Sequence, residues 1–312
     1  MGVAATIFIP SVAPLFKVEA TKRMGADVRL VDGVYDDAYE AALAWQKENG
    51  GVFIHPFDDK DVIAGQGTIG LEILEQLPAP DAVAVPVGGG GLISGVAFAL
   101  KMLHPSCKVY GVQAAGAGSM LRSLENRAPT ALNSVSTFAD GIAVKSPGAA
   151  TFGLCARYVD QIVTVTDDEA ATAILTLMEQ QKLVAEGAGV VAVAAVLFDK
   201  LPLAGKKVCA VISGGNIDVN ILSRVISRGL LTTGRLSELT IEMLDKPGQL
   251  KEVSAIIAGL GANVTKVRHN AGGENTAIIG CCLHIFMETK NKAHFLAVKR
   301  AIQGAGYRIA EE

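Results

Sequence analysis

The stretch DAVAVPVGGGGLISG, residues 81–95, decides how this chain folds. Its alternating valines predict a strand that is buried on both faces, and the apolar residues 92–103 predict a helix. Between the two stand four consecutive glycines: Gly88, Gly89, Gly90 and Gly91. Unpaired backbone amides at such a turn and the positive end of the helix dipole converge on one point. This arrangement is typical of a site for an anion such as phosphate.

Three interpretations of the glycine turn remain open. The first is a tight turn in which the glycines only permit close packing. The second is a dinucleotide site, because Gly89, Gly91 and Gly95 fit a loose G-x-G-x-x-x-G spacing. The next predicted strand, residues 108–113, ends without the acidic residue that would bind a ribose, which disfavours this second interpretation. The third, a small phosphate-bearing cofactor, agrees best with the pattern.

The composition is that of a globular chain with a large core. Half of the 312 residues are hydrophobic, a length and content that predict two or more domains. The net charge of −3 comes from interspersed signs, so neither a basic face for nucleic acid nor a polybasic membrane anchor is expected. The longest apolar stretch, residues 187–198, is too short to span a bilayer.

The five cysteines are scattered and form no C-x-x-C pair. Their apolar surroundings predict reduced, buried thiols and a cytoplasmic location. Cys281, Cys282 and His284 suggest a metal cluster, but they lie in a run with strand periodicity. Since neighbouring side chains of a strand point to opposite faces, only Cys282 and His284 would share a face. We therefore expect no metal site.

Up to residue 227 the chain alternates predicted strands and helices, which implies an α/β fold with parallel strands and right-handed crossovers. The predicted strands include residues 6–10, 28–31 and 52–55, and the predicted helices include residues 16–24, 35–49, 69–77 and 167–181. The segment 57–68 carries Gly65 and Gly67. It is interpreted either as a close-packed turn or as a place where backbone amides meet a ligand.

A second predicted strand runs directly into polar and glycine residues. Residues 207–212 predict a buried strand that is followed by Ser213-Gly214-Gly215-Asn216. In an open parallel sheet, ligands bind at the carboxyl ends of the strands. We therefore expect the glycine turn and the strand exit at Ser213 to face the same ligand.

After residue 227 the character of the chain changes. Residues 228–236 contain two glycines and two threonines and predict a linker. Residues 237–312 then show a β-α-β-β-α-β order, which is typical of a ferredoxin-like unit. The predicted elements are strands near 239–243, 262–269, 278–287 and 307–309, helices at 249–260 and 292–304, and a turn at 271–275. We expect this unit to fold as a domain of its own.

Taken together, these segments resemble the threonine dehydratases (L-threonine ammonia-lyases). The motifs that carry the resemblance are HPFDD at 55–59, AGQGTIGLEI at 64–73, PVGGGGLISG at 86–95, ADGIAV at 139–144, EGAG at 186–189, SGGNID at 213–218, and RGL, GRL and DKPGQL between 228 and 250. The resemblance implies a pyridoxal-phosphate enzyme of fold type II, tryptophan synthase β-like, with a C-terminal ACT domain. By the same resemblance, residues 1–55 are a remnant of the small lobe and residues 56–227 the large lobe of a catalytic domain.

The resemblance also implies roles for particular residues. Gly88, Gly89, Gly90, Gly91 and Leu92 would hold the phosphate of pyridoxal 5'-phosphate, and Ser213 would hydrogen-bond its pyridine nitrogen. The reaction implied is elimination of water and ammonia from L-threonine, and from L-serine more slowly, giving 2-oxobutanoate or pyruvate. The implied effector site of the ACT domain comprises Asp245, Gly248, Gln249, Leu250 and Asn263. A homo-oligomer, a dimer or a tetramer, is expected.

One departure from the family matters. The family's Schiff-base lysine lies in a motif of the type Ser/Phe-Lys-x-Arg-Gly-Ala, which this sequence lacks. Lys17 resembles it superficially and is interpreted as a solvated lysine at a helix start. We therefore expect the catalytic lysine and the family's leading elements to be missing, and the chain alone to be inactive. The alternative is a non-catalytic protein that senses amino acids or mediates assembly through its ACT domain.

Overall fold

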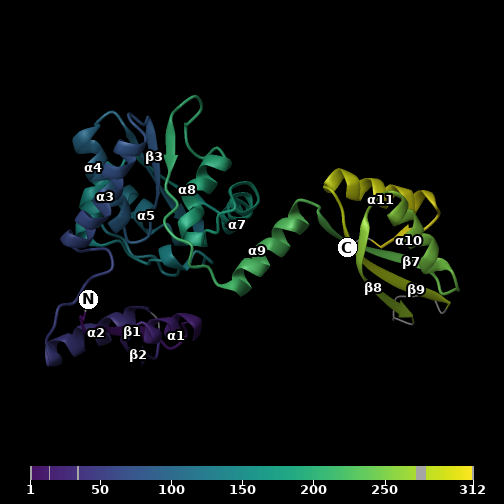
Figure 1. Cartoon of the computed structure of the whole chain (residues 1–312), viewed down its shortest axis with the longest axis horizontal. Coiled ribbons are helices and arrows are strands. Elements are labelled where there is room, and N and C mark those ends of the chain that lie inside the picture. Colours follow the sequence, from purple (N-terminus) through teal and green to yellow (C-terminus); the bar gives the residue numbers. More distant parts are fainter. Residues whose placement is uncertain (1, 14, 34, 272–278, 311–312) are drawn as a thin grey trace.

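The computed structural model describes residues 2–13, 15–33, 35–271 and 279–310, and it contains three sheets (Figure 1). The first sheet is small and parallel, with strands β1 (Thr6–Pro10) and β2 (Asp27–Val31). Helices α1 (Leu15–Arg23) and α2 (Tyr35–Asn49) accompany it. The strand predicted at 52–55 is wrong: Val52 and Ile54 are largely exposed, and no described strand pairs with this segment.

The second sheet is central and entirely parallel, which confirms the predicted α/β architecture. Its strands are β3 (Ala82–Pro86), β4 (Lys108–Ala114), β5 (Gln161–Val165) and β6 (Val208–Ala210), in the order β5-β4-β3-β6. Strand β6 is shorter than the predicted 207–212. Strand β3 is buried along its whole length, as its valines predicted. Its carboxyl end and that of β6 lie side by side, because Ala84 pairs with Ala210.

Helices cover both faces of this sheet. One face carries α3 (Lys60–Gln76), α4 (Gly91–Leu103), α5 (Ser119–Asn126) and α6 (Ala149–Tyr158). The other carries α7 (Asp167–Thr176) and α8 (Gly187–Leu197). Short helical turns η1 (Ala115–Ala117), η2 (Asp140–Ile142) and η3 (Leu177–Gln181) lie in the connections. The last of these is π-helical, so the single helix predicted at 167–181 is interrupted.

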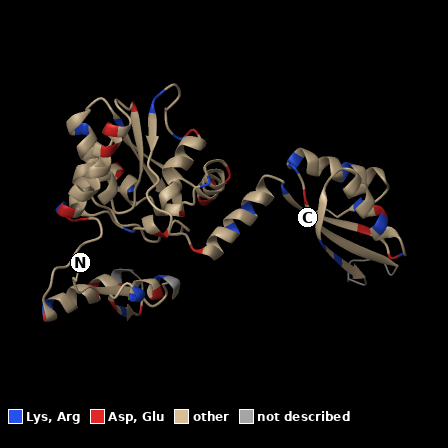
Figure 2. Ribbon diagram, in the orientation of Figure 1, with Lys and Arg blue, Asp and Glu red and all other residues tan. Residues whose placement is uncertain are grey.

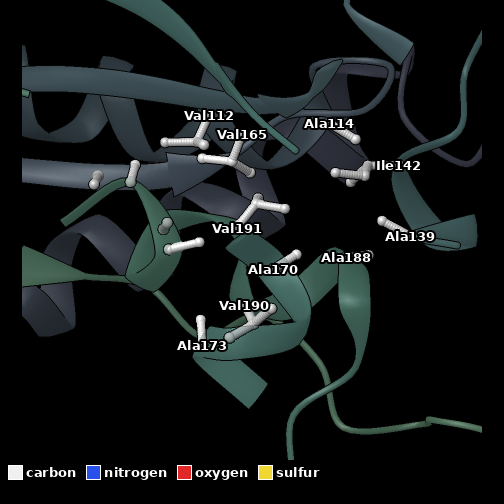
Figure 3. Close-up of a cluster of buried hydrophobic side chains, with 14 of the residues drawn as sticks. Val112, Ala114, Ala139, Ile142, Val165, Ala170, Ala173, Ala188, Val190 and Val191 are labelled. Carbon is white, nitrogen blue, oxygen red and sulfur yellow. The ribbon is translucent and has the colours of Figure 1, made fainter. Parts of the chain in front are cut away.

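Small side chains bring α7 and α8 close to the sheet. Figure 3 shows Val112 and Val165 of the sheet lying over Val191 of α8, with Ala170 of α7 beside it. All four are nearly fully buried. Burial of such apolar area contributes about 25 cal/mol per Å² to the free energy of unfolding. This layer of the core therefore holds the carboxyl ends of β4 and β5 against the helices.

Helix α3 begins at Lys60, nine residues before the predicted helix start at 69. Asp59 caps it by accepting hydrogen bonds from the amides of Asp61 and Val62. Gly65 and Gly67 therefore lie within a helix and not in a ligand-binding loop. Gly67 instead packs against Gly95 of α4. A Cβ added to Gly95 would collide with Ile63 O and lie 2.6 Å from Gly67 N. The glycines permit two helix backbones to approach closely.

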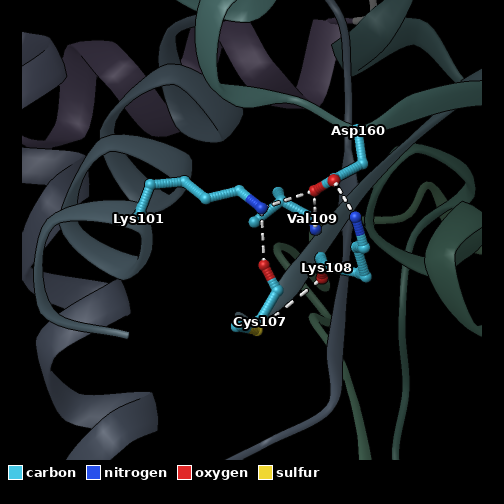
Figure 4. Close-up of polar contacts among 5 residues, drawn as sticks. All are labelled: Lys101, Cys107, Lys108, Val109 and Asp160. Atoms are coloured by element: carbon cyan, nitrogen blue, oxygen red, sulfur yellow. Dashed lines mark hydrogen bonds and ion pairs between the residues drawn. The ribbon is translucent and has the colours of Figure 1, made fainter. Parts of the chain in front are cut away.

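A partly exposed ion-pair network ties α4 to the sheet (Figure 4). The Asp160 carboxylate accepts hydrogen bonds from Lys101 Nζ at 2.7 Å, Lys108 Nζ at 2.8 Å and Val109 N at 2.8 Å. Burial alone would raise the pKa of Asp160, but these donors outweigh burial and hold that pKa below its ordinary value. Burial raises the pKa of the neighbouring Cys107 thiol to about 11, so this thiol is neutral and unreactive.

The third sheet belongs to the C-terminal unit and confirms the predicted β-α-β-β-α-β order. Its elements are β7 (Leu236–Leu244), α10 (Gln249–Gly259), β8 (Asn263–Ala271), β9 (Gly280–Glu288), α11 (Lys292–Gly304) and β10 (Arg308–Ile309). The strand order is β10-β7-β9-β8. Ile241, Ile257, Ile285 and Ile302 belong to a separate core between this sheet and its helices. Most of the predicted turn at 271–275 lies outside the described residues.

The linker predicted at 228–236 is mostly helical. Helix α9 (Val219–Thr232) runs through Arg228 and connects the two larger parts of the molecule (Figure 1). Gly229 is accommodated inside α9 because it lies directly against Leu175 of α7, where a larger residue would collide. Strand β7 then begins at Leu236, so only residues 233–235 form the actual connection.

Charged residues are distributed along the described chain, and both signs occur in each part of the molecule (Figure 2). Within the described part of the chain, no helix has the length and apolar character needed to cross a membrane. All five cysteines are free thiols, of which Cys107, Cys155 and Cys281 are buried and Cys209 and Cys282 are partly buried.

Candidate functional site

The two glycine-rich strand exits line one pocket of about 300 Å³ at the carboxyl ends of β3 and β6. This placement agrees with the expectation that they face the same ligand. Every residue predicted to bind the cofactor is among the lining residues: Gly88, Gly89, Gly90, Gly91, Leu92 and Ser213. Others come from three separate segments: Phe57 and Gln66, then Gly141 and Ile142, then Glu186 and Ala188.

The glycine turn presents bare backbone to this pocket. Helix α4 begins at Gly91, and Gly90 precedes it with a positive φ of 99°, a conformation that L side chains rarely adopt. The first amides of a helix have no intrahelical partner, so those of α4 are free in principle to bind an anion. Thr151 Oγ1 donates a hydrogen bond to Gly89 O at 2.7 Å, and Ser94 N donates to Gly90 O at 3.0 Å. These bonds hold the shape of the turn.

The HPFDD segment supports the glycine turn in a way that the sequence analysis missed. His55 Nδ1 accepts hydrogen bonds from the amides of Phe57 and Asp58 at 3.2 and 2.8 Å. The Asp58 carboxylate in turn accepts from Ala149 N at 3.1 Å and Thr151 N at 3.0 Å. Asp58 thus caps α6 from a distant part of the chain and positions Thr151 against the turn. No local pattern reveals this partner, because about ninety residues separate the two segments.

Glu186 is the second functional candidate that the sequence analysis did not assign. Among the described residues that line the pocket, it is the one with an ionisable side chain. Its Oε1 lies beside Gly214, where any Cβ would collide with it, and 3.6 Å from the position a Cβ would take on Gly141. Its amide donates to Gly214 O at 3.0 Å. The carboxylate therefore faces the pocket between two glycines and can accept a hydrogen bond or a proton from a bound molecule.

Lys17 is paired, which differs from its interpretation as a solvated lysine. Its Nζ lies 2.5 Å from Asp140 Oδ2, and its side chain is 34% exposed. Asp140 precedes the pocket residue Gly141, so this ion pair joins α1 to the rim of the pocket. No lysine is found among the described residues that line the pocket itself.

The five residues predicted for an effector site do not come together in one chain. Gly248 adopts a positive φ of 97° and precedes α10, and Gln249 lines a second pocket of about 530 Å³. Asn263 pairs with Glu288 at the start of β8, level with Leu236, whereas Asp245 follows the far end of β7. A nine-residue strand spans roughly 27 Å. The prediction that Asn263 faces Asp245 is therefore wrong within one chain, because α10 returns the chain to the opposite end of the sheet.

The pocket beside the glycine turn fits a small phosphate-bearing cofactor. Its volume of about 300 Å³ lies within the range of small-molecule sites. Glycine backbone and a helix start form one wall, and the Ser213 hydroxyl and the Glu186 carboxylate come from the neighbouring strand exit and helix start. A phosphate at the helix start and a polar ring edge at Ser213 are the contacts that these groups can make.

Comparison with known proteins agrees with this geometry. The chain is 50% identical over 308 residues to the L-threonine ammonia-lyase of Thermotoga maritima, a match that covers 99% of this chain and 77% of the relative. The structure resembles the processed form of threonine deaminase isoform 2 from Solanum lycopersicum, with a TM-score of 0.68, 39% identity and coverage of 73% of this chain and 67% of that one. It also resembles maize serine racemase, with a TM-score of 0.68, 34% identity and coverage of 73% and 71%.

A family profile described as pyridoxal-phosphate dependent enzyme matches residues 1–214. These residues contain β1 to β6, the glycine turn and Ser213, and thus the whole described pocket. The match spans more than half of the chain, and the structural neighbours have a similar fold. The chain therefore belongs to the family of pyridoxal-phosphate dependent enzymes.

Proposed function

We propose that this protein serves the pyridoxal-phosphate dependent elimination of water and ammonia from L-threonine, which gives 2-oxobutanoate. L-serine is the expected second substrate, with pyruvate as product. The observation that supports this most directly is the 50% identity to an L-threonine ammonia-lyase over nearly the whole chain. A serine racemase shares the fold, so the fold alone does not select the reaction. The comparisons do not favour the alternative of a non-catalytic sensing or assembly protein.

In this reaction the chain's own residues bind and orient the cofactor and the substrate. Bound pyridoxal phosphate supplies the electron sink that lets the Cα proton and the β-hydroxyl leave. The amides of the glycine turn would hold its phosphate, and Ser213 would hydrogen-bond its ring nitrogen. Because a hydroxyl, unlike a carboxylate, does not require the ring nitrogen to be protonated, a serine at this position suits prompt elimination of the β-hydroxyl. The carboxylate of Glu186 is placed to accept a hydrogen bond from cofactor or substrate.

The test uses stable conjugates of cofactor and substrate, because their binding does not depend on a lysine. Phosphopyridoxyl-L-threonine and phosphopyridoxyl-D-threonine are titrated against the full chain by calorimetry. We expect the L-conjugate to bind at least roughly tenfold more tightly, about 1.4 kcal/mol, since only one enantiomer can present its β-hydroxyl correctly. Equal affinities would refute a pocket shaped for L-threonine. Replacement Ser213→Ala should weaken both conjugates equally.

We further propose that residues 237–312 form an ACT domain that binds a small amino acid in a dimer. Support comes from the β-α-β-β-α-β order and from the glycine-bearing loop between β7 and α10. Asp245, Gly248, Gln249 and Leu250 lie in or next to that loop. Asn263 lies at the other end of the sheet, so it joins the effector site only if a second copy supplies it.

Valine and isoleucine, titrated into the full chain by calorimetry, test this proposal. We expect saturable binding of at least one of them, and loss of that binding in Gly248→Val, because a β-branched residue cannot adopt φ 97° without strain. Gly259→Ala in the adjacent helix α10 is the matched control, since nothing lies within 4 Å of its added Cβ. A chain that sediments as a monomer and produces no heat with either amino acid would contradict both the effector and the dimer.

A further inference from the structure

Three side chains of metal-binding type converge at one end of the C-terminal sheet. They are Asp245, His269 and Cys281, and their ligand atoms all lie within 4.8 Å of one another. Asp245 Oδ1 and His269 Nε2 are 3.4 Å apart, with both side chains about half exposed. Cys281 is 1% exposed. A carboxylate, an imidazole and a thiol thus meet between water and the core.

The strand register places Asp245 and His269 as diagonal neighbours of Cys281 on its two sides. In β9, Cys281 pairs with Met243 of β7 on one side and with Ala271 of β8 on the other. Asp245 lies two residues beyond Met243, and His269 lies two residues before Ala271. Residues two apart on a strand share a face, so all three side chains belong to the face that α10 and α11 cover. The side chains of Asp245 and His269 therefore approach each other over Cys281.

We propose that Asp245, His269 and Cys281 bind one zinc ion. Zn²⁺ takes oxygen, nitrogen and sulfur ligands at about 2.0 to 2.3 Å, so ligand atoms around it are about 3.5 Å apart. The distance between Asp245 Oδ1 and His269 Nε2 already has this value. The three ligand atoms lie within 4.8 Å of one another, so a shift of the exposed side chains by about 1 Å brings the remaining distances to it. Water completes a tetrahedral site from the open side. The ion joins the ends of β7, β8 and β9.

The pair that the sequence singled out is not part of this site. Cys282 and His284 lie on the opposite face of β9, as the alternation predicted. His284 Nδ1 is 3.0 Å from Thr240 Oγ1 and is thus engaged in a hydrogen bond. Only the register of three strands shows that Cys281 has a histidine and an aspartate beside it.

Zinc binding at this site releases the proton of the Cys281 thiol. Burial, and then the charge of Asp245, raise the pKa of the Cys281 thiol, so the free thiol is protonated at neutral pH. When the zinc–sulfur bond forms, the thiol proton passes to solvent. Affinity is therefore expected to rise with pH. Because Asp245 belongs to the proposed effector loop, zinc and an amino acid ammonium group would compete for its carboxylate.

Titration of the full chain with CoCl₂ and ZnCl₂ tests the proposal. We expect one Co²⁺ per chain with a thiolate-to-cobalt charge-transfer band in the near ultraviolet, which ZnCl₂ abolishes. Cys281→Ser should remove the band, and His269→Gln should weaken zinc binding at least roughly 100-fold in competition with a chelating dye. The matched controls Cys282→Ser and His284→Gln should change neither signal.

Each alternative outcome would overturn the site. A cobalt spectrum without the thiolate band, or a band that survives in Cys281→Ser, excludes Cys281 as a ligand. Equal losses in the Cys282→Ser and His284→Gln controls would move the ion to the other face of the sheet. If Cys281→Ser does not fold, His269→Gln alone decides, because His269 is half exposed and its replacement leaves the core intact. Unchanged zinc affinity in His269→Gln would refute the proposal.

Discussion

Gly95→Ala is expected to lower the free energy of unfolding by at least about 3 kcal/mol, the upper end of the usual cost of overpacking. The added methyl group would collide with Ile63 O and lie 2.6 Å from Gly67 N, and both atoms are backbone atoms of α3. Neither can rotate away, so α3 and α4 must separate. Because α4 starts at the glycine turn, that separation would also displace the candidate phosphate site. Urea unfolding followed by circular dichroism measures the change.

Gly65→Ala is the matched control for this substitution. Gly65 lies in α3 as well, but nothing lies within 4 Å of an added Cβ. Alanine in a helix interior is more favourable than glycine by roughly 0.5 to 1 kcal/mol, so this variant should be slightly more stable than the natural chain. If the free energies of unfolding of Gly95→Ala and Gly65→Ala differ by less than about 1 kcal/mol, the close contact between α3 and α4 is not rigid.

Gly90→Val is expected to weaken binding of pyridoxal phosphate at least roughly 100-fold, or about 2.7 kcal/mol. Gly90 has φ 99°, and a Cβ there would lie 2.6 Å from Met120 Cε and 2.9 Å from Thr151 Cβ. Valine must therefore change the backbone of the turn, which removes the amides from the phosphate position. The measurement is a fluorescence titration of the full chain with pyridoxal phosphate.

Two further variants make that result interpretable. Gly153→Ala in α6 meets nothing within 4 Å and should bind the cofactor like the natural chain. Thr151→Val removes the hydrogen bond to Gly89 O without touching the turn's backbone, so it should weaken binding by roughly tenfold. If Gly90→Val binds pyridoxal phosphate as tightly as Gly153→Ala, the glycine turn is not the phosphate site.

The local sequence pattern was sufficient to predict those elements whose formation depends only on neighbouring residues. The buried strand β3, the helix α4 and the glycine turn between them follow from residues 81–95 alone, because strand and helix periodicities are visible within such a window. The C-terminal β-α-β-β-α-β order was visible for the same reason. The strand predicted at 52–55 fails because a strand needs a neighbouring strand, and no residue of the segment reports whether one is present.

Helix α3 shows why other predictions failed. Gly65 and Gly67 are typical of a loop, but the cost of Gly67 in a helix is offset by its contact with α4, whose Gly95 lies 28 residues further along the chain. The same holds for α9, where Gly229 is accommodated by Leu175 of another helix. In both cases the compensating atom belongs to a residue that is distant in the sequence.

The sequence by itself determined the parallel α/β body and the strand-turn-helix order around residues 88–91, because strand and helix periodicities are visible locally. Its motifs indicated the pyridoxal-phosphate class through their resemblance to a known family. Only the tertiary structure decided which groups share a site. Crossover helices and strand register placed Glu186 beside Gly214 and His269 beside Asp245. They also separated Asn263 from Asp245 by the length of a strand. Such distances depend on how whole elements pack, and packing is a property of residues far apart in the chain.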